Sequence, residues 1–379
     1  MKEGWEYKSL GEVCEILDSR RKPITKNKRE SGTIPYYGAT GILDYVKDYI
    51  FDEKLVLLGE DGAKWGAGEN SAYIVEGKTW VNNHAHALRP KREHLIDELL
   101  VYYLNFANLQ PFITGVTVPK LNQEKMRSIE IPVPPLSEQQ SIVDYLDSAF
   151  AKIDAMKANA EKALNEAKAL FQASLKEMLE PKEGWEEKKL KEIAQIKIGP
   201  FGSLLHKKDY ISGGVPLVNP IHMVNGHIAI DNNYTISESK AKELSSYLLK
   251  ENDIVFARRG EIGRCALVGE KENTYLCGTG SLFVRFNQEV DYGFMLLLFQ
   301  SKYCKEYLEK QATGATMLNI NSAIVGDMPI KYPHTNIQQS IVATLDSLKS
   351  KVDRLQENYE KISQECDALK QAILRQVFE

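Results

Sequence analysis

The chain has 379 residues, of which 43% are hydrophobic and 26% are charged, and its net charge at pH 7 is −4. This is the composition of an ordinary globular protein, and the length allows two or three domains. Apolar runs are too short to cross a membrane and Met1-Lys2-Glu3 does not resemble a signal peptide, so we predict a cytoplasmic protein with no membrane partner. Five scattered cysteines without a C-x-x-C pair argue against a disulfide framework or a structural zinc.

The first half of the sequence recurs in the second half. The matching segments are Lys2–Glu6 with Lys182–Glu186, Thr114–Thr117 with Thr313–Thr316, and Gln139–Val143 with Gln338–Val342. A repeat of this length indicates a duplicated domain rather than a solenoid unit. Two copies predict a pseudo-two-fold molecule that meets a partner or a target twice.

In chain order, each copy begins with a short segment led by Trp5 or Trp185. In the first copy Ser9 and Glu12 fit a capping box, which predicts a helix of one or two turns before the next strand. Period-two stretches such as 253–257 then predict a β-rich body.

One amphipathic helix is expected to close each body. Its apolar face is formed by Ile96, Leu99, Leu100, Tyr103 and Leu104 in the first copy, and by Phe294, Leu297, Leu298 and Tyr307 in the second. The Thr-Gly-x-Thr turn then leads through a proline-containing segment into a long helix.

The two long segments 137–180 and 336–379 contain no proline or glycine and carry heptad patterns, which predict an antiparallel coiled coil. The first expected seam is Ile142, Leu146, Ala149, Ile153, Met156, Ala160, Ala163, Ala167 and Leu170. The second expected seam is Ile341, Leu345, Leu348, Val352, Leu355, Tyr359, Ile362, Cys366 and Leu369. The predicted class is α+β, with globular domains at 1–136 and 181–335 joined by these helices.

Basic residues cluster beside glycine-rich turns in both copies. Segment 20–29 has six basic residues and no acid, while Lys207-Lys208 and Arg258-Arg259 with Arg264 are basic in the second copy. One such run alone is as often a solvated loop as a binding surface. Recurrence beside glycines, where backbone can approach phosphates, favours nucleic-acid binding.

Residue patterns for catalysis are weak. Segment 72–79 fits the loose P-loop pattern, but its strand-forming residues argue against a phosphate cradle. Asn219-Pro220-Ile221-His222 resembles the adenine-methyltransferase tetrapeptide, yet it lacks the second proline and the stacking aromatic residue. His84 and His86 share one face of a strand, but no third metal ligand stands at a useful spacing. We predict no catalytic residue and no bound metal.

The whole chain resembles the DNA-specificity subunit of a type I restriction-modification system. Segment 131–143 matches the family's first helix start, whereas 330–342 has lost the proline pair, the leucine and the glutamate. The recognition-domain motifs are Ile34–Ile42, Glu60–Ala63 and Asn82–His86 in the first copy, and Gly199–Ser203, Gly214–Val218 and Asn252–Gly260 in the second.

The resemblance implies that each globular domain reads one half of a split double-stranded DNA site and that the helix pair sets the gap. Two methylation subunits would dock on the helices and bring S-adenosylmethionine and the adenine-N6 chemistry, so this chain itself needs no cofactor; motor-nuclease restriction subunits would then join. The helix starts 137–148 and 336–347 match at 8 of 12 positions, as a repeated docking surface requires.

Candidate site residues follow from both lines of argument. The candidate DNA contacts are Lys64, Asn82, Asn83, His84 and His86 in the first domain, of which half could merely brace the sheet, and Lys207, Lys208, Asn219, Arg258, Arg259 and Arg264 in the second. The candidate docking residues are Gln139, Gln140, Asp144, Asp147, Gln338, Gln339 and Asp346.

Two other classes of protein stay open at this point. A coiled-coil adaptor that binds only protein is mildly favoured by the near-neutral charge of the domains. A stand-alone methyltransferase or NTPase would need a cofactor pocket, for which the sequence has no motif.

Overall fold

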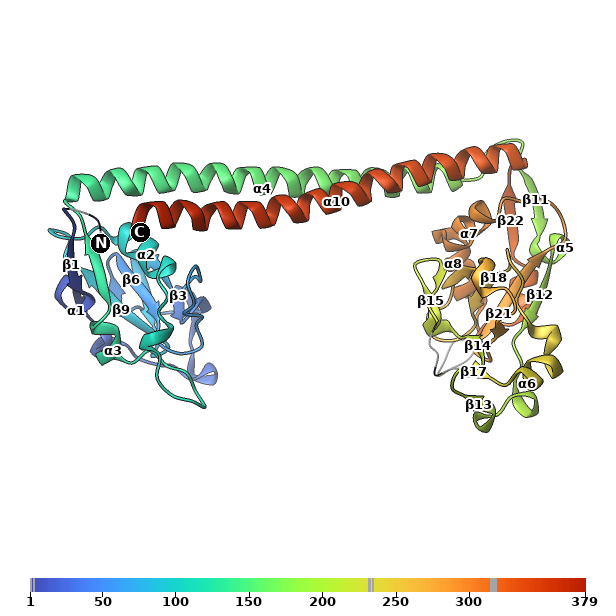
Figure 1. The fold of residues 1–379 in the computed structure, drawn as a ribbon, viewed down its shortest axis with the longest axis horizontal. Coiled ribbons are helices and arrows are strands. Elements are labelled where there is room, and N and C mark those ends of the chain that lie inside the picture. Colours follow the sequence, from blue (N-terminus) through green and yellow to red (C-terminus); the bar gives the residue numbers. More distant parts are fainter. Residues whose placement is uncertain (1, 3, 231–232, 234, 314–318) are drawn as a thin grey trace. The chain divides into compact units, whose positions relative to one another are not determined.

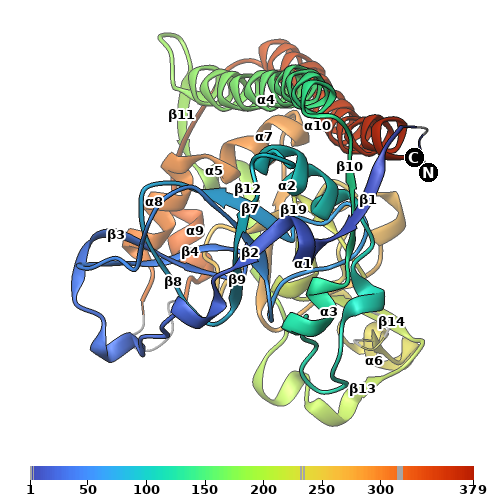
Figure 2. The ribbon, with the colours of Figure 1, turned by 90° about the vertical axis from the view of Figure 1, so that its left-hand side faces the viewer.

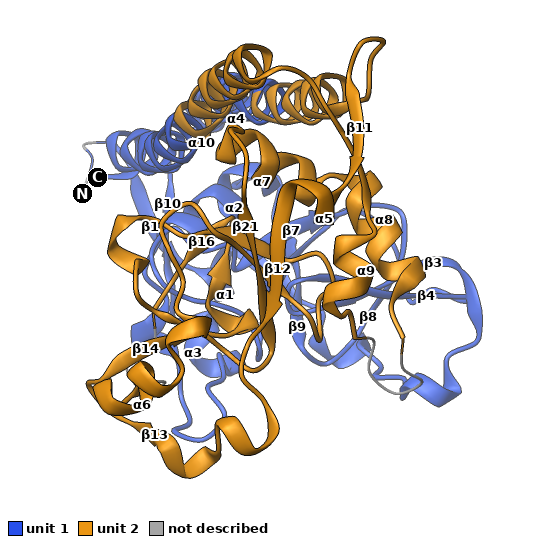
Figure 3. Ribbon diagram, turned by 90° about the vertical axis from the view of Figure 1, so that its right-hand side faces the viewer, with its two compact units in different colours: residues 1–163, 357–379 blue, residues 164–356 orange. Residues whose placement is uncertain are grey.

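The computed structural model describes residues 2, 4–230, 233, 235–313 and 319–379. The chain forms two compact units, one of residues 1–163 with 357–379 and one of residues 164–356 (Figure 3). Figure 1 labels the helices and strands of both units. The predicted α+β duplication is confirmed, because three features of unit 1 return in unit 2: a two-stranded ribbon, a four-stranded antiparallel sheet and an end of the helix pair.

Unit 1 contains one ribbon and two four-stranded sheets. The ribbon pairs β1 (Glu6–Ser9) with β10 (Glu130–Val133). The first sheet has the order β2 (Cys14–Ile16), β9 (Ala85–Pro90), β6 (Leu55–Gly59) and β7 (Ala72–Val75). The second has the order β4 (Gly41–Val46), β3 (Ser31–Gly38), β8 (Lys78–Val81) and β5 (Phe51–Asp52). Its helices are α1 (Leu10–Val13), α2 (Asp97–Phe106) and α3 (Gln123–Arg127) (Figure 2).

Unit 2 repeats the ribbon as β11 (Glu186–Lys189) with β22 (Pro329–Tyr332). The first sheet returns as β12 (Ala194–Ile198), β21 (Ser281–Phe286), β18 (Ile254–Ala257) and β19 (Cys265–Leu267). The other strands form a different sheet, β13 (Tyr210–Ile211), β17 (Thr235–Ile236), β14 (Val215–Val218) and β20 (Leu276–Cys277), and a hairpin, β15 (Met223–Val224) with β16 (His227–Ile228). Its helices are α5 (Leu190–Ile193), α6 (Glu238–Glu243), α7 (Tyr292–Gln300), α8 (Lys302–Gln311) and α9 (Ser322–Gly326).

The central strand of the shared sheet is buried on both faces in each unit. In β6, Val56 and Leu58 join the core beneath α2, while Leu55 and Leu57 join a second core on the opposite face. Strand β18 does the same with Ile254 and Phe256 on one face and Val255 and Ala257 on the other. Because side chains alternate along a strand, a continuous apolar run supplies two cores at once.

Local sequence signals set several element boundaries. The Glu12 carboxylate accepts hydrogen bonds from the backbone amide and the hydroxyl of Ser9, which confirms the predicted capping box before β2. The prediction of a single helix near 294–307 is wrong, because the helix is interrupted at Ser301. Ser301 ends α7 and caps α8, its side chain accepting a hydrogen bond from the Cys304 amide. Of the second Thr-Gly-x-Thr motif, residues 314–316 lie outside the described residues.

The long helices α4 (Leu136–Leu179) and α10 (Thr335–Phe378) run antiparallel within each unit. In unit 1, Lys157 Nζ lies 3.1 Å from Asp367 Oδ1 and Lys370 Nζ lies 2.5 Å from Asp154 Oδ1. In unit 2, Lys168 Nζ donates to Gln356 Oε1 at 2.7 Å. The predicted antiparallel coiled coil is confirmed.

Half of the predicted seam of α4 has the wrong phase. Ile153 is buried as expected, but Met156 and Leu170 are 57% and 62% exposed. Leu164, one residue after the predicted Ala163, is buried instead. Because the seam repeats every 3.5 residues, either of two adjacent residues fits the pattern at every second seam position. Only contact with the partner helix decides which of the two is buried. On α10, Leu355 and Leu369 are likewise exposed, whereas Leu345 and Cys366 are buried as predicted.

Candidate nucleic-acid interface

A turn after β6 forms the centre of the candidate site in unit 1. It consists of Glu60, Asp61 and Gly62, and Gly62 has a φ of +73°, in the left-handed region that favours glycine. The Glu60 amide donates to the carbonyl of His84 at 2.9 Å, and the Leu121 amide donates to the carbonyl of Glu60 at 2.8 Å.

The segment 114–120 closes on the same turn. Thr114 and Lys120 form an antiparallel bridge, and Lys120 forms a second bridge with Asp61. Val116, near the middle of this segment, is fully exposed. The backbone therefore brings His84 and segment 114–121 against the turn at 60–62.

Unit 2 builds the same turn after β18, from Arg258, Arg259 and Gly260, with a φ of +79° at Gly260. The Arg258 amide donates to the carbonyl of Gly280 at 3.0 Å, and the Ile320 amide donates to the carbonyl of Arg258 at 3.0 Å. Asn319 forms bridges with Arg259 and with Thr313. The structural equivalents are therefore Glu60 and Arg258, Asp61 and Arg259, His84 and Gly280, and Lys120 and Asn319.

A buried charge network supports the turn in unit 1. Glu60 Oε2 lies 2.5 Å from the Arg21 guanidinium, and Glu60 Oε1 lies 2.6 Å from Lys120 Nζ. His86 lies beside them, with Nδ1 at 2.6 Å from Asp18 Oδ2 and Nε2 at 2.7 Å from the carbonyl of Leu121. These contacts fix the base of segment 114–120 to the sheet.

The pKa values of the two carboxyl groups reflect this network. Burial raises the pKa of Asp18, but the hydrogen bond and charge of His86 and the charge of Arg21 outweigh it, so that the pKa is held below its usual value. Burial also opposes ionisation of Glu60, and hydrogen bonds from Lys120 and Arg21 again hold its pKa below the usual value. Both groups are therefore carboxylates at neutral pH.

Asp18, Glu60 and His86 place ligand atoms within 4.8 Å of one another, which is a spacing that a metal ion could use. The donor set does not favour one, because Arg21 and Lys120 already place fixed positive charges on the same carboxylates. We interpret the cluster as an ion-pair network that supports the turn.

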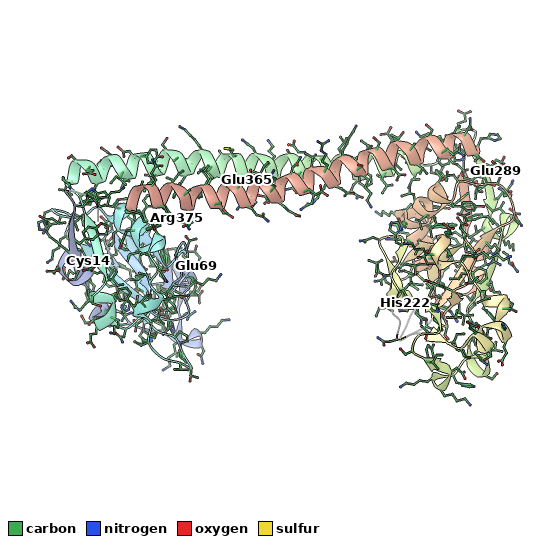
Figure 4. The ribbon with its side chains drawn as sticks, viewed as in Figure 1. Cys14, Glu69, His222, Glu289, Glu365 and Arg375 are labelled. Carbon is green, nitrogen blue, oxygen red and sulfur yellow. The ribbon has the colours of Figure 1, made fainter. Side chains whose placement is uncertain are left out.

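The candidate DNA contacts of unit 1 separate into two groups. Asn82 and His86, predicted as DNA contacts, are both buried and hydrogen-bonded within unit 1. Asn82 accepts a hydrogen bond from the His84 amide and His86 braces segment 114–120. Asn83, His84 and Lys64 are exposed. The Lys64 ammonium lies 3.9 Å from the carboxylate of Glu69, which Figure 4 labels.

The basic residues of segment 20–29 also fall into two groups. Its arginines all contact carboxylates of the unit, Arg20 at the surface with Glu53, and the less exposed Arg21 with Glu60 and Arg29 with Asp44. Its lysines, at 22, 26 and 28, are exposed. Arg21 also donates to the carbonyl of Ala85 at 2.6 Å, which brings the segment next to Asp61 and His84.

In unit 2, the predicted DNA contact Arg258 is only 8% exposed, and its Nε donates to Asn319 Oδ1 at 3.3 Å. Burial and the charge of Arg259 lower its pKa. Arg264 bonds to the Glu261 carboxylate and to the carbonyl of Pro220, which removes most of its availability to phosphate. Arg259 remains exposed.

The other candidates of unit 2 are accessible to different degrees. Lys207 and Lys208 are exposed on a short 3-10 turn, and Asn219 is half-buried. Glycine is required opposite Asn219, because a Cβ on Gly278 would lie 2.2 Å from its Oδ1. Gly280, at the end of segment 278–280, supplies the carbonyl that accepts a hydrogen bond from the Arg258 amide. Asn219 therefore lies in the surroundings of the turn.

The helix starts also correct the sequence analysis. Gln139 and Gln338 are buried, so the expectation that they are surface docking residues is wrong. Gln139 accepts from the Ile96 amide and donates to the carbonyls of His94 and Pro134; Gln338 accepts from the Asp291 amide and donates to the carbonyl of Pro333. The exposed candidates are Gln140, Asp144, Asp147, Gln339 and Asp346.

Asp61 and Lys120 are not among the candidates that the sequence predicted. The available signals were the motif Glu60–Ala63, which contains Asp61, and the first Thr-Gly-x-Thr turn, which Lys120 follows. Segment 72–79 forms β7 and β8 rather than a phosphate-binding loop. Over the described residues, no helix is long and apolar enough to cross a membrane.

The duplicated domains thus each carry their own version of one turn. Residues 2–166 and 182–364 match the family model described as the type I restriction modification DNA specificity domain, and the chain belongs to this family. A protein of Haemophilus influenzae assigned as a type I restriction enzyme specificity subunit is 30% identical over 93% of this chain and 89% of its own length. The MjaVIII specificity subunit of Methanocaldococcus jannaschii is 23% identical over 95% of this chain and 89% of its own length.

Solved structures show the same fold. The HsdS subunit from Thermoanaerobacter tengcongensis superposes with a TM-score of 0.66 at 19% identity, covering 100% of this chain and 97% of its own. A chain from a structural study of the assembly of a type I R-M system has a TM-score of 0.70 at 18% identity, covering 100% and 98%.

Proposed function

We propose that the two domains read the two halves of a split double-stranded DNA site and that the helix pair sets the gap between the halves. The observation that carries this proposal is the pair of equivalent turns, one after β6 and one after β18, which share a backbone but carry different side chains. Two readers of one identical sequence would need no such difference, whereas the two halves of an asymmetric site require it.

We further propose that the helix starts dock two copies of a methylation subunit, which supplies S-adenosylmethionine and methylates adenine N6, and that motor-nuclease subunits complete the assembly. Exposed polar residues recur there in both copies as Gln140 with Gln339 and Asp147 with Asp346. The specificity subunits named among the relatives come from restriction enzymes of this type. A surface that binds the same subunit twice must remain alike.

Two experiments test these roles. The complex with the methylation subunit should bind DNA with an affinity that falls steeply with salt, and the genome of the host should carry adenine methylation in a two-part motif. An adaptor that binds only protein would give neither result.

Charge reversal by Asp147→Lys with Asp346→Lys should impair assembly with the methylation subunit while both domains stay folded. Normal assembly of this variant would place docking elsewhere.

A further inference from the structure

Asp61 and Arg259 occupy one structural position in the two units, but they carry opposite charges. Each follows a buried residue, Glu60 or Arg258, whose backbone binds the neighbouring segments in the same way. Each precedes a glycine with positive φ, and each bridges to the residue that ends the 114–120 or 313–319 segment. The backbone of the turn is thus constant, and the outward side chain varies.

The side chains beneath the turn explain how this variation is tolerated. Unit 1 pairs Glu60 with Lys120 at 2.6 Å, and unit 2 pairs Arg258 with Asn319 at 3.3 Å. The supporting pair differs in charge between the units, yet in both it joins the turn to the following segment. The side chain of the outward residue is separate from this supporting pair in both units, so it can vary while the pair holds the turn.

In unit 1 the outward position presents hydrogen-bond acceptors. Asp61 Oδ1 contacts His84 Nδ1 at 2.5 Å, and the His84 side chain is 49% exposed. When neutral His84 donates its Nδ1 proton to Asp61, its Nε2 is an acceptor, and the second carboxylate oxygen of Asp61 is another. In unit 2, Arg259 presents only donors, in a planar fork.

A carboxylate at a DNA surface is repelled by phosphates, so backbone binding does not account for Asp61. Carboxylates do accept hydrogen bonds from the exocyclic amino groups of bases, as from cytosine N4 in the major groove. Arginine is the side chain that most often binds guanine O6 and N7 together. The chemistry of the two turns therefore matches two different bases.

We propose that Asp61 with His84 reads a base that bears an amino group in one half of the DNA site, and that Arg259 reads a guanine in the other half. This inference rests on the proposed DNA-recognition function and assigns its specificity-determining position. Lys64 and the exposed lysines of segment 20–29 in unit 1, and Lys207 and Lys208 in unit 2, contact phosphates around these readers.

The test uses the full chain in complex with its methylation subunit and a library of DNA sites, with methylation of each sequence as the readout. Arg259→Ala should lower discrimination at one position of one half-site by about 5- to 150-fold, and Arg259→Lys should lower it less, because an ammonium group keeps the charge but lacks the planar fork of arginine. Asp61→Asn should relax one position in the other half-site only. Lys64→Ala and Lys207→Ala, the matched controls, should weaken all sequences alike.

Each outcome decides the inference. If Arg259→Ala weakens all sequences alike and leaves the discrimination among bases unchanged, Arg259 binds phosphate and its assignment is overturned. If Asp61→Asn leaves discrimination unchanged, Asp61 only orients His84 and the assignment in unit 1 is overturned. If the wild-type complex methylates no defined motif, the proposed function fails instead, so the two failures are distinguishable. Unfolding temperatures of the variants should match the wild type, since neither side chain supports the turn.

Discussion

Lys120 Nζ lies 2.6 Å from Glu60 Oε1, and this ion pair fastens segment 114–120 to the turn that carries Asp61. Glu60 is at the same time in contact with Arg21 at 2.5 Å and with His86 at 3.6 Å. One carboxylate thus joins a basic segment, a sheet strand and an exposed loop. The geometry of the candidate DNA surface of unit 1 depends on it.

Removal of this carboxylate should destabilise unit 1. Glu60→Ala leaves Arg21 and Lys120 without their shared acceptor, and we expect a loss of roughly 2–4 kcal/mol in the free energy of unfolding. Urea denaturation followed by tryptophan fluorescence measures it. The control is Glu30→Ala, which breaks the exposed pair with Lys47 and should cost about 0.5 kcal/mol or less. Equal effects of the two variants would contradict the role of Glu60.

The same network predicts an acid-sensitive unit 1. Because the pKa values of Asp18 and Glu60 are held below their usual values, the stability that they contribute is fully present above their unfolded-state pKa values. It is lost as the pH falls through the lower folded-state values. Unfolding free energies measured from pH 7 down to pH 3 should fall below about pH 4. Glu60→Gln should flatten this fall, and an unchanged slope would show that other groups cause it.

The buried glutamines at the helix starts should matter more than their exposed neighbours. Gln139→Leu removes the hydrogen-bond partners of the Ile96 amide and of two carbonyl groups, so we expect the free energy of unfolding to fall by about 2–3 kcal/mol. Gln140→Leu changes the adjacent residue, which is exposed and whose side chain donates a hydrogen bond to Asp144. This substitution should change the free energy of unfolding by about 0.5 kcal/mol or less. Thermal unfolding of the two variants compares them, and a similar shift in both would refute this reading.

The thiols should be inert in the folded protein. All five cysteines are buried, and burial raises the pKa of Cys14 (Figure 4), Cys265 and Cys304 to about 12. Thiolates are therefore almost absent at pH 8. A thiol-reactive dye should label less than one cysteine per chain in native protein and all five in denaturant. Rapid labelling of native protein would reveal an opening that exposes the cores.

The helix pair offers a test of how the gap in the DNA site is set. One added heptad in each helix preserves the seam and lengthens the pair by roughly 10 Å. The contacts of Lys157 with Asp367 and of Lys370 with Asp154 place Ala160 near the level of Gln364, so the insertions belong after these residues. We expect either unchanged half-sites with about three more base pairs between them, or loss of activity. Sequencing of methylated DNA distinguishes these two outcomes. Full activity at the original spacing would refute the model.

Much of the architecture follows from the sequence alone. The duplication, the capping box at Ser9, the strand character of 72–79 and the antiparallel helix pair all rest on local patterns and on repetition, which are present in the chain before it folds. The motif Glu60–Ala63 and the run Arg258-Arg259-Gly260 also marked the two turns, because a glycine directly after a strand is a local signal. The family resemblance led to the same class of protein.

Tertiary structure alone decided which of the candidate side chains face outward. Asn82, His86, Gln139, Gln338 and Arg258 look like surface residues in the sequence, yet they are buried, because distant backbone groups and charges satisfy them. The seam of α4 is a similar case, since the choice between Met156 and its neighbour depends on the opposite helix. The equivalence of Asp61 with Arg259 arises from hydrogen bonds between segments some 60 residues apart, such as Leu121 with Glu60. No local pattern encodes that pairing, because it exists only once the chain has folded.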